Sequence, residues 1–345
     1  MANTLRPRRG ARRPWHAATG PVRTIVLLVI LALALAGPRA VAATELHLLS
    51  SWPSEYLGVR KLAMRYMENV ETASDGRIRF TLSGPEAIPA FEQLTPTALG
   101  IFDVLFTHGM FHFETSAMGT AVDAIRADPA TVHESGVWNA VDAHYRARGL
   151  KLLAMPVMTP GYVLMLRTPL DGACDLAGRR IRAAPIHQGL VEALGGQVVE
   201  LPAPAVGDAL ARGDIDGVAW PLLNGLDYPW YEHARALLRP SFGTVTHLVL
   251  ISLATWNTLD AADRAVLSEQ GVALEVRAWK KSDKYTARIE GELLAHGLQA
   301  TLPCEATRER LDKTWSDGVW ALGIVRGGDE IAHLRELAEA AGITP

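Results

Sequence analysis

The chain has few of the residues from which metal and cofactor sites are built. Among 345 residues there are two cysteines, Cys174 and Cys304, and the sequence contains no C-x-x-C, no H-E-x-x-H and no phosphate-binding G-x-x-x-x-G-K loop. These absences argue against a cysteine-based zinc site, a zinc-peptidase helix and a P-loop nucleotide site. The two cysteines are far apart in sequence, so they either form a disulfide or stay free, and the sequence leaves both possibilities open.

Acidic residues are absent from the amino-terminal segment. Residues 1–43 carry seven arginines and no aspartate or glutamate. The basic region is followed by an apolar run, I-V-L-L-V-I-L-A-L-A-L-A, and then by Ala40-Val41-Ala42, a typical cleavage signal. This pattern predicts a signal peptide over residues 1–43, with export by either the general or the twin-arginine route and a periplasmic location. An uncleaved membrane anchor remains the alternative.

The remainder of the chain lacks a basic excess. Beyond residue 43, 27 of the 34 basic residues remain against all 37 acidic residues, a net charge of −10. General nucleic-acid binding needs a basic surface that neutralises phosphates, so we expect no nucleic-acid partner.

Apolar segments with strand and helix spacing alternate along the mature chain. Strands are expected at residues 45–50, 77–82, 103–106, 152–156, 162–166, 180–183, 197–200, 215–220 and 247–253. Helices are expected near residues 59–70, 90–99, 189–194 and 206–211, and a long one over 260–296, where Asp260 occupies an N-cap position. This alternation predicts an α/β protein with two lobes and largely parallel sheets.

Four short motifs resemble one known family. They are D-L-A-G-R-R-I-R-A-A-P (175–185), A-L-A-R-G-D-I-D-G (209–217) followed by Pro221, S-D-G-R-I (74–78), and W-N-T-L (256–259) with Asp263-Arg264. Their order and spacing are similar to those of the solute-binding subunits of tripartite ATP-independent periplasmic (TRAP) transporters. The resemblance covers nearly all of the mature chain.

The resemblance implies an α/β, two-lobed periplasmic-binding-protein-like fold with hinge strands and a long helix spanning both lobes. We expect lobe I to comprise residues 44–160 plus 248–283, and lobe II residues 161–247 plus 284–345. The implied function is capture of a small organic acid (a carboxylate) in the interlobe cleft and its delivery to the membrane permease subunits, without catalysis. A monomer is expected, with the helix predicted over 331–341 able to pack on the second lobe. A membrane-anchored or transporter-independent binding or sensor protein is the alternative, and an enzyme on the same scaffold is a more remote one.

In that family the arginine at the position of Arg182 binds the ligand's carboxylate, a task that suits a planar, permanently charged guanidinium. Relatives that bind keto acids have a tryptophan where this chain has Trp220, preceded by a glutamate that helps to hold a cation. Here Ala219 precedes Trp220, so neither a metal nor another cofactor is expected. A second family arginine is missing near Tyr162, which suggests a ligand with one carboxylate or a less polar remainder.

Further candidate ligand-binding residues follow strand ends or lie in loops. Ser51 and Trp52 come after the first strand, His108 follows the strand near residue 106, and Asn224 lies in a polar loop beyond Pro221. For Trp220, Tyr162 and His108, packing or a satisfied structural hydrogen bond is the alternative to a binding role.

Overall fold

The computed structural model describes residues 1–2, 10 and 43–345. Residues 43–345 form a compact unit. The predicted signal peptide lies almost entirely outside the described residues. None of the helices within the described residues has both the length and the apolar character needed to cross a bilayer.

Two mixed β-sheets organise the unit. The first contains β1 (Thr44–Ser50), β2 (Ile78–Ser83), β3 (Val104–His108), β4 (Leu150–Ala154), β5 (Val157–Met158) and β11 (Val245–Ser252). The second contains β6 (Tyr162–Leu166), β7 (Arg180–Arg182), β8 (Gln197–Val199), β9 (Gly217–Pro221), β10 (Ala236–Leu238) and β12 (Gln299–Thr301).

The expectation of largely parallel sheets is wrong, because each sheet contains a strand, β11 in the first and β6 in the second, that runs antiparallel to its neighbours. β1 is parallel to β2 and β3, but β11 runs antiparallel to β3, β4 and β5. In the second sheet β7 is parallel to β8 and β9, whereas β6 is antiparallel to β9 and β10. A strand that enters a sheet from the other half of the unit need not follow a crossover helix, so its direction is free to reverse.

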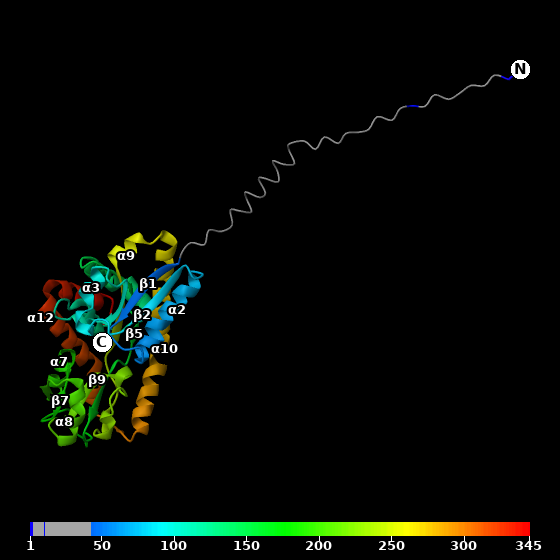
Figure 1. The fold of residues 1–345 in the computed structure, drawn as a ribbon. Coiled ribbons are helices and arrows are strands. Elements are labelled where there is room, and N and C mark those ends of the chain that lie inside the picture. Colours follow the sequence, from blue (N-terminus) through cyan, green and yellow to red (C-terminus); the bar gives the residue numbers. More distant parts are fainter. Residues whose placement is uncertain (3–9, 11–42) are drawn as a thin grey trace. The chain divides into compact units, whose positions relative to one another are not determined.

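Helices cover both sheets. The helices are α2 (Met64–Ala73), α3 (Leu94–Ala98), α4 (Met118–Ala121), α5 (Pro129–Glu134), α6 (Val137–Arg146), α7 (Pro185–Ala193), α8 (Val206–Arg212), α9 (Leu253–Thr258), α10 (Ala261–Ala295), α11 (Glu305–Glu309) and α12 (Leu311–Ala340). Single turns are η1 (Val59–Ala63), η2 (Ala90–Glu92), η3 (Gly109–His112), η4 (Val122–Ala124), η5 (Ala203–Ala205), η6 (Leu222–Asn224) and η7 (Trp230–Glu232). In Figure 1, β1, β2 and α2 lie in one half of the unit, and β7, β9 and α8 lie in the other.

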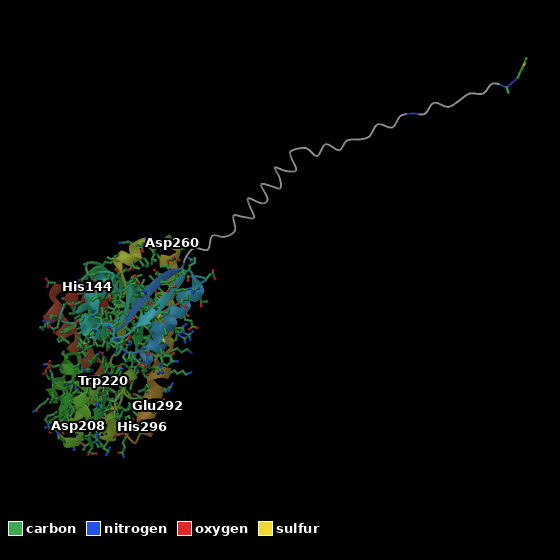
Figure 2. The ribbon with its side chains drawn as sticks, in the orientation of Figure 1. His144, Asp208, Trp220, Asp260, Glu292 and His296 are labelled. Carbon is green, nitrogen blue, oxygen red and sulfur yellow. A yellow bond between two sulfur atoms is a disulfide. The ribbon has the colours of Figure 1, made fainter. Side chains whose placement is uncertain are left out.

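The long helix predicted over 260–296 is confirmed as α10, which runs along both halves (Figure 1). Asp260 caps it as expected, since its Oδ1 accepts a hydrogen bond from the Asp263 N–H at 2.8 Å. Leu267 and Leu274 belong to the core of the first sheet, while Leu293 belongs to the core of the second. Figure 2 labels Asp260 and His296, the two residues that flank this helix.

The last long helix, α12, also contacts both halves. It packs on α7 of the second half and on α4 of the first, so it does more than cover the second lobe. Trp315 and Trp320 are fully buried in a core cluster that includes residues of both sheets. The structure also pairs Cys174 with Cys304 in a disulfide, which settles the alternative that the sequence leaves open.

Candidate functional site

A cavity of about 720 Å³ lies between side chains of the two sheets. It is lined from the first half by Trp52, Pro53, Glu55, Tyr56, Phe91, His108, Met110, Phe111 and Val245, and from the second by Tyr162, Arg182, Ala184, Ile186, His187, Trp220, Pro221, Asn224, Asp227 and Tyr228. Its size is that of a small-molecule site. Six of the seven predicted site residues, all except Ser51, line it.

Arg182 is the last residue of β7, a strand held between β8 and β9. Arg182 is 9% exposed, and its Nε donates a hydrogen bond to the Leu201 carbonyl at 3.0 Å. The buried Nη1 has no hydrogen-bond partner, and within the described residues no carboxylate forms an ion pair with this guanidinium. Burial lowers the pKa of Arg182, although the group stays protonated at any physiological pH. A buried cation without a counter-ion is energetically costly, because its charge is desolvated and not compensated.

Trp220 supports this guanidinium from β9. The Arg182 guanidinium carbon lies 4.9 Å from the centre of the Trp220 ring, a cation–π contact that fixes the plane of the guanidinium. The indole Nε1 donates to the Asn224 carbonyl at 3.2 Å, and the ring packs edge-on against Trp230 at 4.8 Å between centres. Figure 2 labels Trp220 in the second half of the unit. The Asn224 amide nitrogen donates to the carboxylate of Asp227, which also lines the cavity.

Tyr162 and His108 line the cavity, but their polar atoms are hydrogen-bonded within the protein. The Tyr162 hydroxyl donates to Asp123 Oδ2 at 2.9 Å, and His108 Nε2 lies 2.8 Å from the same oxygen. His108 Nδ1 accepts from the Met110 N–H at 3.2 Å, which places the ring proton on Nε2. Asp123 Oδ1 accepts from the Thr246 N–H at 2.7 Å.

Sequence reasoning missed Asp123, whose carboxylate is hydrogen-bonded to residues of β3, β6 and β11, two of which line the cavity. The sequence does contain a signal, because Asp123 is an acidic residue inside the apolar stretch G-T-A-V-D-A-I. In the structure its side chain is buried, with the residue 1% exposed. A buried carboxylate must be hydrogen-bonded, so such a residue marks a polar network.

Ser51 departs from the prediction, because it does not line the cavity. Its hydroxyl lies 2.7 Å from both Gln93 Oε1 and Thr107 Oγ1, which satisfies it inside the first half. We therefore leave Ser51 out of the proposed site. Its neighbour Trp52 does line the cavity, with ring centres 5.0 Å from Tyr56 and 5.2 Å from Phe111.

His187 is a second residue that the sequence reasoning missed. It lies in the first turn of α7, lines the cavity and is 2% exposed. Its Nδ1 accepts from the Ala184 N–H at 3.2 Å, while its buried Nε2 has no partner. Burial, aided by the nearby charge of Arg182, lowers the pKa of His187 to about 3, so the ring is neutral at physiological pH.

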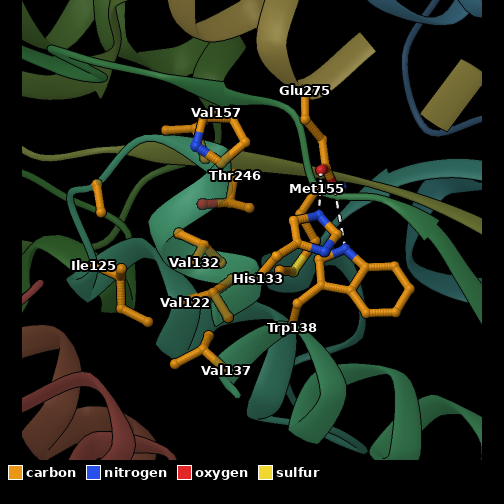
Figure 3. A pocket seen from close by; sticks show the side chains of 12 residues that line it. Val122, Ile125, Val132, His133, Val137, Trp138, Met155, Val157, Thr246 and Glu275 are labelled. Atoms are coloured by element: carbon orange, nitrogen blue, oxygen red, sulfur yellow. Dashed lines mark hydrogen bonds and ion pairs between the residues drawn. The ribbon is translucent and has the colours of Figure 1, made fainter. Parts of the chain in front are cut away.

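A second pocket, shown in Figure 3, is too small for an organic ligand. Its volume is about 20 Å³, which is room for about one water molecule. The Glu275 carboxylate there accepts hydrogen bonds from the Trp138 indole at 3.1 Å and the Met155 N–H at 2.6 Å, and His133 Nε2 lies 2.7 Å from it. In the described part of the chain no group of three or more histidine, cysteine, aspartate or glutamate side chains is arranged to hold a metal ion.

Comparison with known proteins identifies the family. Residues 99–317 match the sequence model of the bacterial extracellular solute-binding proteins, family 7 (DctP). The chain belongs to this family. The resemblance to TRAP solute-binding subunits, predicted from the four motifs, is thereby confirmed, and the family is one of extracytoplasmic receptors and not of enzymes.

Individual relatives are distant in sequence. The outer membrane transporter protein TsaT of Comamonas testosteroni is 21% identical over 243 residues, which cover 68% of this chain and 72% of that protein. A TRAP periplasmic solute-binding protein from Ochrobactrum anthropi superposes with a TM-score of 0.73 at 20% identity, over 88% of this chain and 97% of that one. A TRAP periplasmic solute-binding protein from Desulfovibrio salexigens with bound orotic acid gives 0.72 at 17% identity, over 86% and 98% of the two chains. These structures establish the two-lobed α/β fold that the sequence predicted.

Proposed function

We propose that this protein is the receptor subunit of a TRAP transporter, and that it binds a small organic acid in the 720 Å³ cavity through a carboxylate–Arg182 ion pair. The observation that carries the proposal is the buried guanidinium of Arg182, which has a nitrogen without a partner and no protein carboxylate beside it. Leaving a cation desolvated and unpaired costs free energy, and a ligand carboxylate recovers it by accepting two parallel hydrogen bonds.

The lining of the cavity favours an acid with one carboxylate and a planar or apolar body. Among the lining residues that the structure describes, Arg182 is the sole arginine or lysine, whereas Glu55 and Asp227 are acidic. A second ligand carboxylate would therefore meet no second cation and would be repelled. Rings dominate the remaining surface (Trp52, Tyr56, Phe91, Phe111, Trp220 and Tyr228), and aromatic side chains stack well on flat ligands.

The remaining steps follow from the two-lobed arrangement. Because the cavity takes side chains from both sheets, closing the two predicted lobes on the ligand would exclude water and strengthen the ion pair with Arg182. We propose that the closed form delivers the acid to the membrane permease subunits, that the protein acts as a monomer in the periplasm, and that residues 1–43 are its signal peptide.

A thermal-shift and calorimetric screen tests the proposal. The panel comprises benzoate, 3-hydroxybenzoate, phenylacetate, orotate, lactate, pyruvate, malonate and succinate. An acid at 100 times its dissociation constant should stabilise the protein by about 2.7 kcal/mol, a rise of a few degrees in melting temperature. We expect one or more monocarboxylates to give this shift, and malonate and succinate to give less.

Arg182→Ala should weaken binding of the best acid at least about 30-fold, because truncating one partner of a buried charged pair costs about 2 kcal/mol or more. The matched control is Arg212→Ala, which removes the same charge from a side chain on α8 that is 63% exposed; it should bind like the wild type. Equal binding by Arg182→Ala would show that the carboxylate site lies elsewhere. A wild-type protein that responds to none of the acids would contradict the proposed function.

A further inference from the structure

We propose that His187 is a second ligand-binding residue, whose Nε2–H donates a hydrogen bond to the same carboxylate that Arg182 holds. This inference rests on the proposed function, because it requires an acid in the cavity. It assigns to the site a neutral donor that neither the motifs nor the family match points to.

The first support is the position of the imidazole. His187 lies five residues after Arg182, in the first turn of the helix that follows β7, and both residues line the cavity. A carboxylate oxygen has two lone pairs, so one oxygen can accept from the guanidinium and from a second donor at the same time.

The second support is the tautomer. The Ala184 N–H points at His187 Nδ1 from 3.2 Å, so Nδ1 is an acceptor and the proton of the neutral ring is on Nε2. That Nε2 is buried and has no hydrogen-bond partner in the structure. A buried donor without an acceptor costs free energy, so its persistence beside a ligand cavity points to an acceptor that arrives with the ligand.

The surroundings make the same corner favourable for negative charge. α7 begins at Pro185, and Ala184, Ile186 and His187 around its first turn line the cavity. The amino-terminal end of a helix carries a partial positive charge, which adds to the field of Arg182. A neutral histidine supplies a donor there without the repulsion that a second full cation beside Arg182 would cause.

Packing offers a competing explanation. The His187 ring meets the Tyr162 ring edge-on, with centres 4.9 Å apart at 86°, and it also lies against Trp315 at 5.8 Å. If the Nε2–H only faces these rings, His187 serves stability and does not bind the ligand. The experiment has to separate these two roles.

Two variants of the full protein do so, with affinity measured by calorimetry for the acid of the panel that binds the wild type best. His187→Leu removes the donor, and His187→Gln keeps an N–H near the position of Nε2. We expect His187→Leu to raise the dissociation constant about 10-fold or more, and His187→Gln to stay within about 3-fold of the wild type. Rescue by glutamine is a result that a packing role does not produce, and melting temperatures of the free proteins record the packing contribution separately.

A double-mutant cycle with Arg182→Ala adds a second readout. If both side chains hold one carboxylate, the loss caused by His187→Leu should shrink in the Arg182→Ala background. A His187→Leu protein that binds within 2-fold of the wild type overturns the inference and leaves the proposed function intact. Loss of binding in Arg182→Ala alone supports the proposed function, whereas failure of the wild type to bind any acid removes both.

Discussion

The helix α10 contains two glycines, Gly271 and Gly291, and we expect their replacement by alanine to change the stability of the protein in opposite directions. An ideal Cβ on Gly271 would lie 2.0 Å from the Leu153 carbonyl oxygen, whereas a Cβ on Gly291 would meet nothing within 4 Å. Both residues lie in the interior of the helix, where alanine is preferred over glycine by about 1 kcal/mol. The difference between the free energies of unfolding of the two variants therefore measures how tightly α10 packs on β4, the strand that contains Leu153.

For Gly271→Ala, the obstacle is a backbone carbonyl, which cannot rotate away as a side chain does. Overpacking of a core lowers the free energy of unfolding by about 1–3 kcal/mol. We expect a loss near the upper end of this range for Gly271→Ala, because the Leu153 carbonyl is part of a rigid strand. One turn further on, Glu275 accepts a hydrogen bond from the Met155 N–H at 2.6 Å, so moving the helix outward also strains that contact. After the gain in helix preference, we expect a net loss of about 2 kcal/mol for Gly271→Ala and a gain of about 0.5–1 kcal/mol for Gly291→Ala.

Urea unfolding followed by tryptophan fluorescence measures both, with the free energy of unfolding extrapolated to water. The wild type and both variants should be compared with the disulfide intact. If Gly271→Ala is as stable as Gly291→Ala, the close approach of α10 to β4 is not a constraint, and the reasoning from the glycine is refuted.

Two further predictions concern stability. Burial lowers the pKa of three histidines from 6.5 to about 3; these are His112, His187 and His247. Since the unfolded chain then binds more protons between pH 6.5 and 3, the free energy of unfolding should fall across that window, by about 2 kcal/mol per histidine at pH 5; equal urea midpoints at pH 7.5 and pH 5 would contradict this. Replacing Cys174 and Cys304 together by serine should lower the free energy of unfolding by about 2–4 kcal/mol, because the bridge closes a loop over a sequence separation of 130 residues, and an unchanged urea midpoint would argue against such a contribution.

Hydrophobic spacing predicts many of the elements of this fold, because it records which segments are buried, but it gave no sign of α5, α6, β10 or β12. The strand ending at Arg182, the helix closed by Gly213 and the α10 cap at Asp260 are all found where the pattern places them. Strand direction is not recorded in that way. An apolar run such as β11 is buried on both faces whether it lies parallel or antiparallel to its neighbours, so periodicity alone did not reveal the mixed sheets.

Individual site residues depend on long-range pairing that short patterns do not contain. Ser51 comes after a strand, as a binding residue would, yet Gln93 and Thr107 satisfy its hydroxyl. In the sequence His187 looks like any polar residue in the first turn of a helix. Only the structure shows that its Nδ1 accepts a hydrogen bond and that its buried Nε2 has no partner. The position of Arg182 at a strand end beside the cavity was predictable, because a motif of eleven residues, 175–185, surrounds it and specifies that strand end.

Internal hydrogen bonds occupy several of the polar groups that line this cavity, and they leave Arg182 as its one basic side chain among the described lining residues. The Tyr162 hydroxyl and His108 Nε2 are both hydrogen-bonded to the carboxylate of Asp123. The other ring nitrogen of His108, Nδ1, accepts from the Met110 N–H. A ligand therefore gains little from them beyond van der Waals contact. Among the described lining residues, the fully buried side-chain atoms left without partners are Arg182 Nη1 and His187 Nε2, and both are donors. Under the proposed function, two buried donors without partners and walls rich in aromatic rings would favour a ligand with one anionic group beside Arg182 and would tolerate variation in the rest of the ligand.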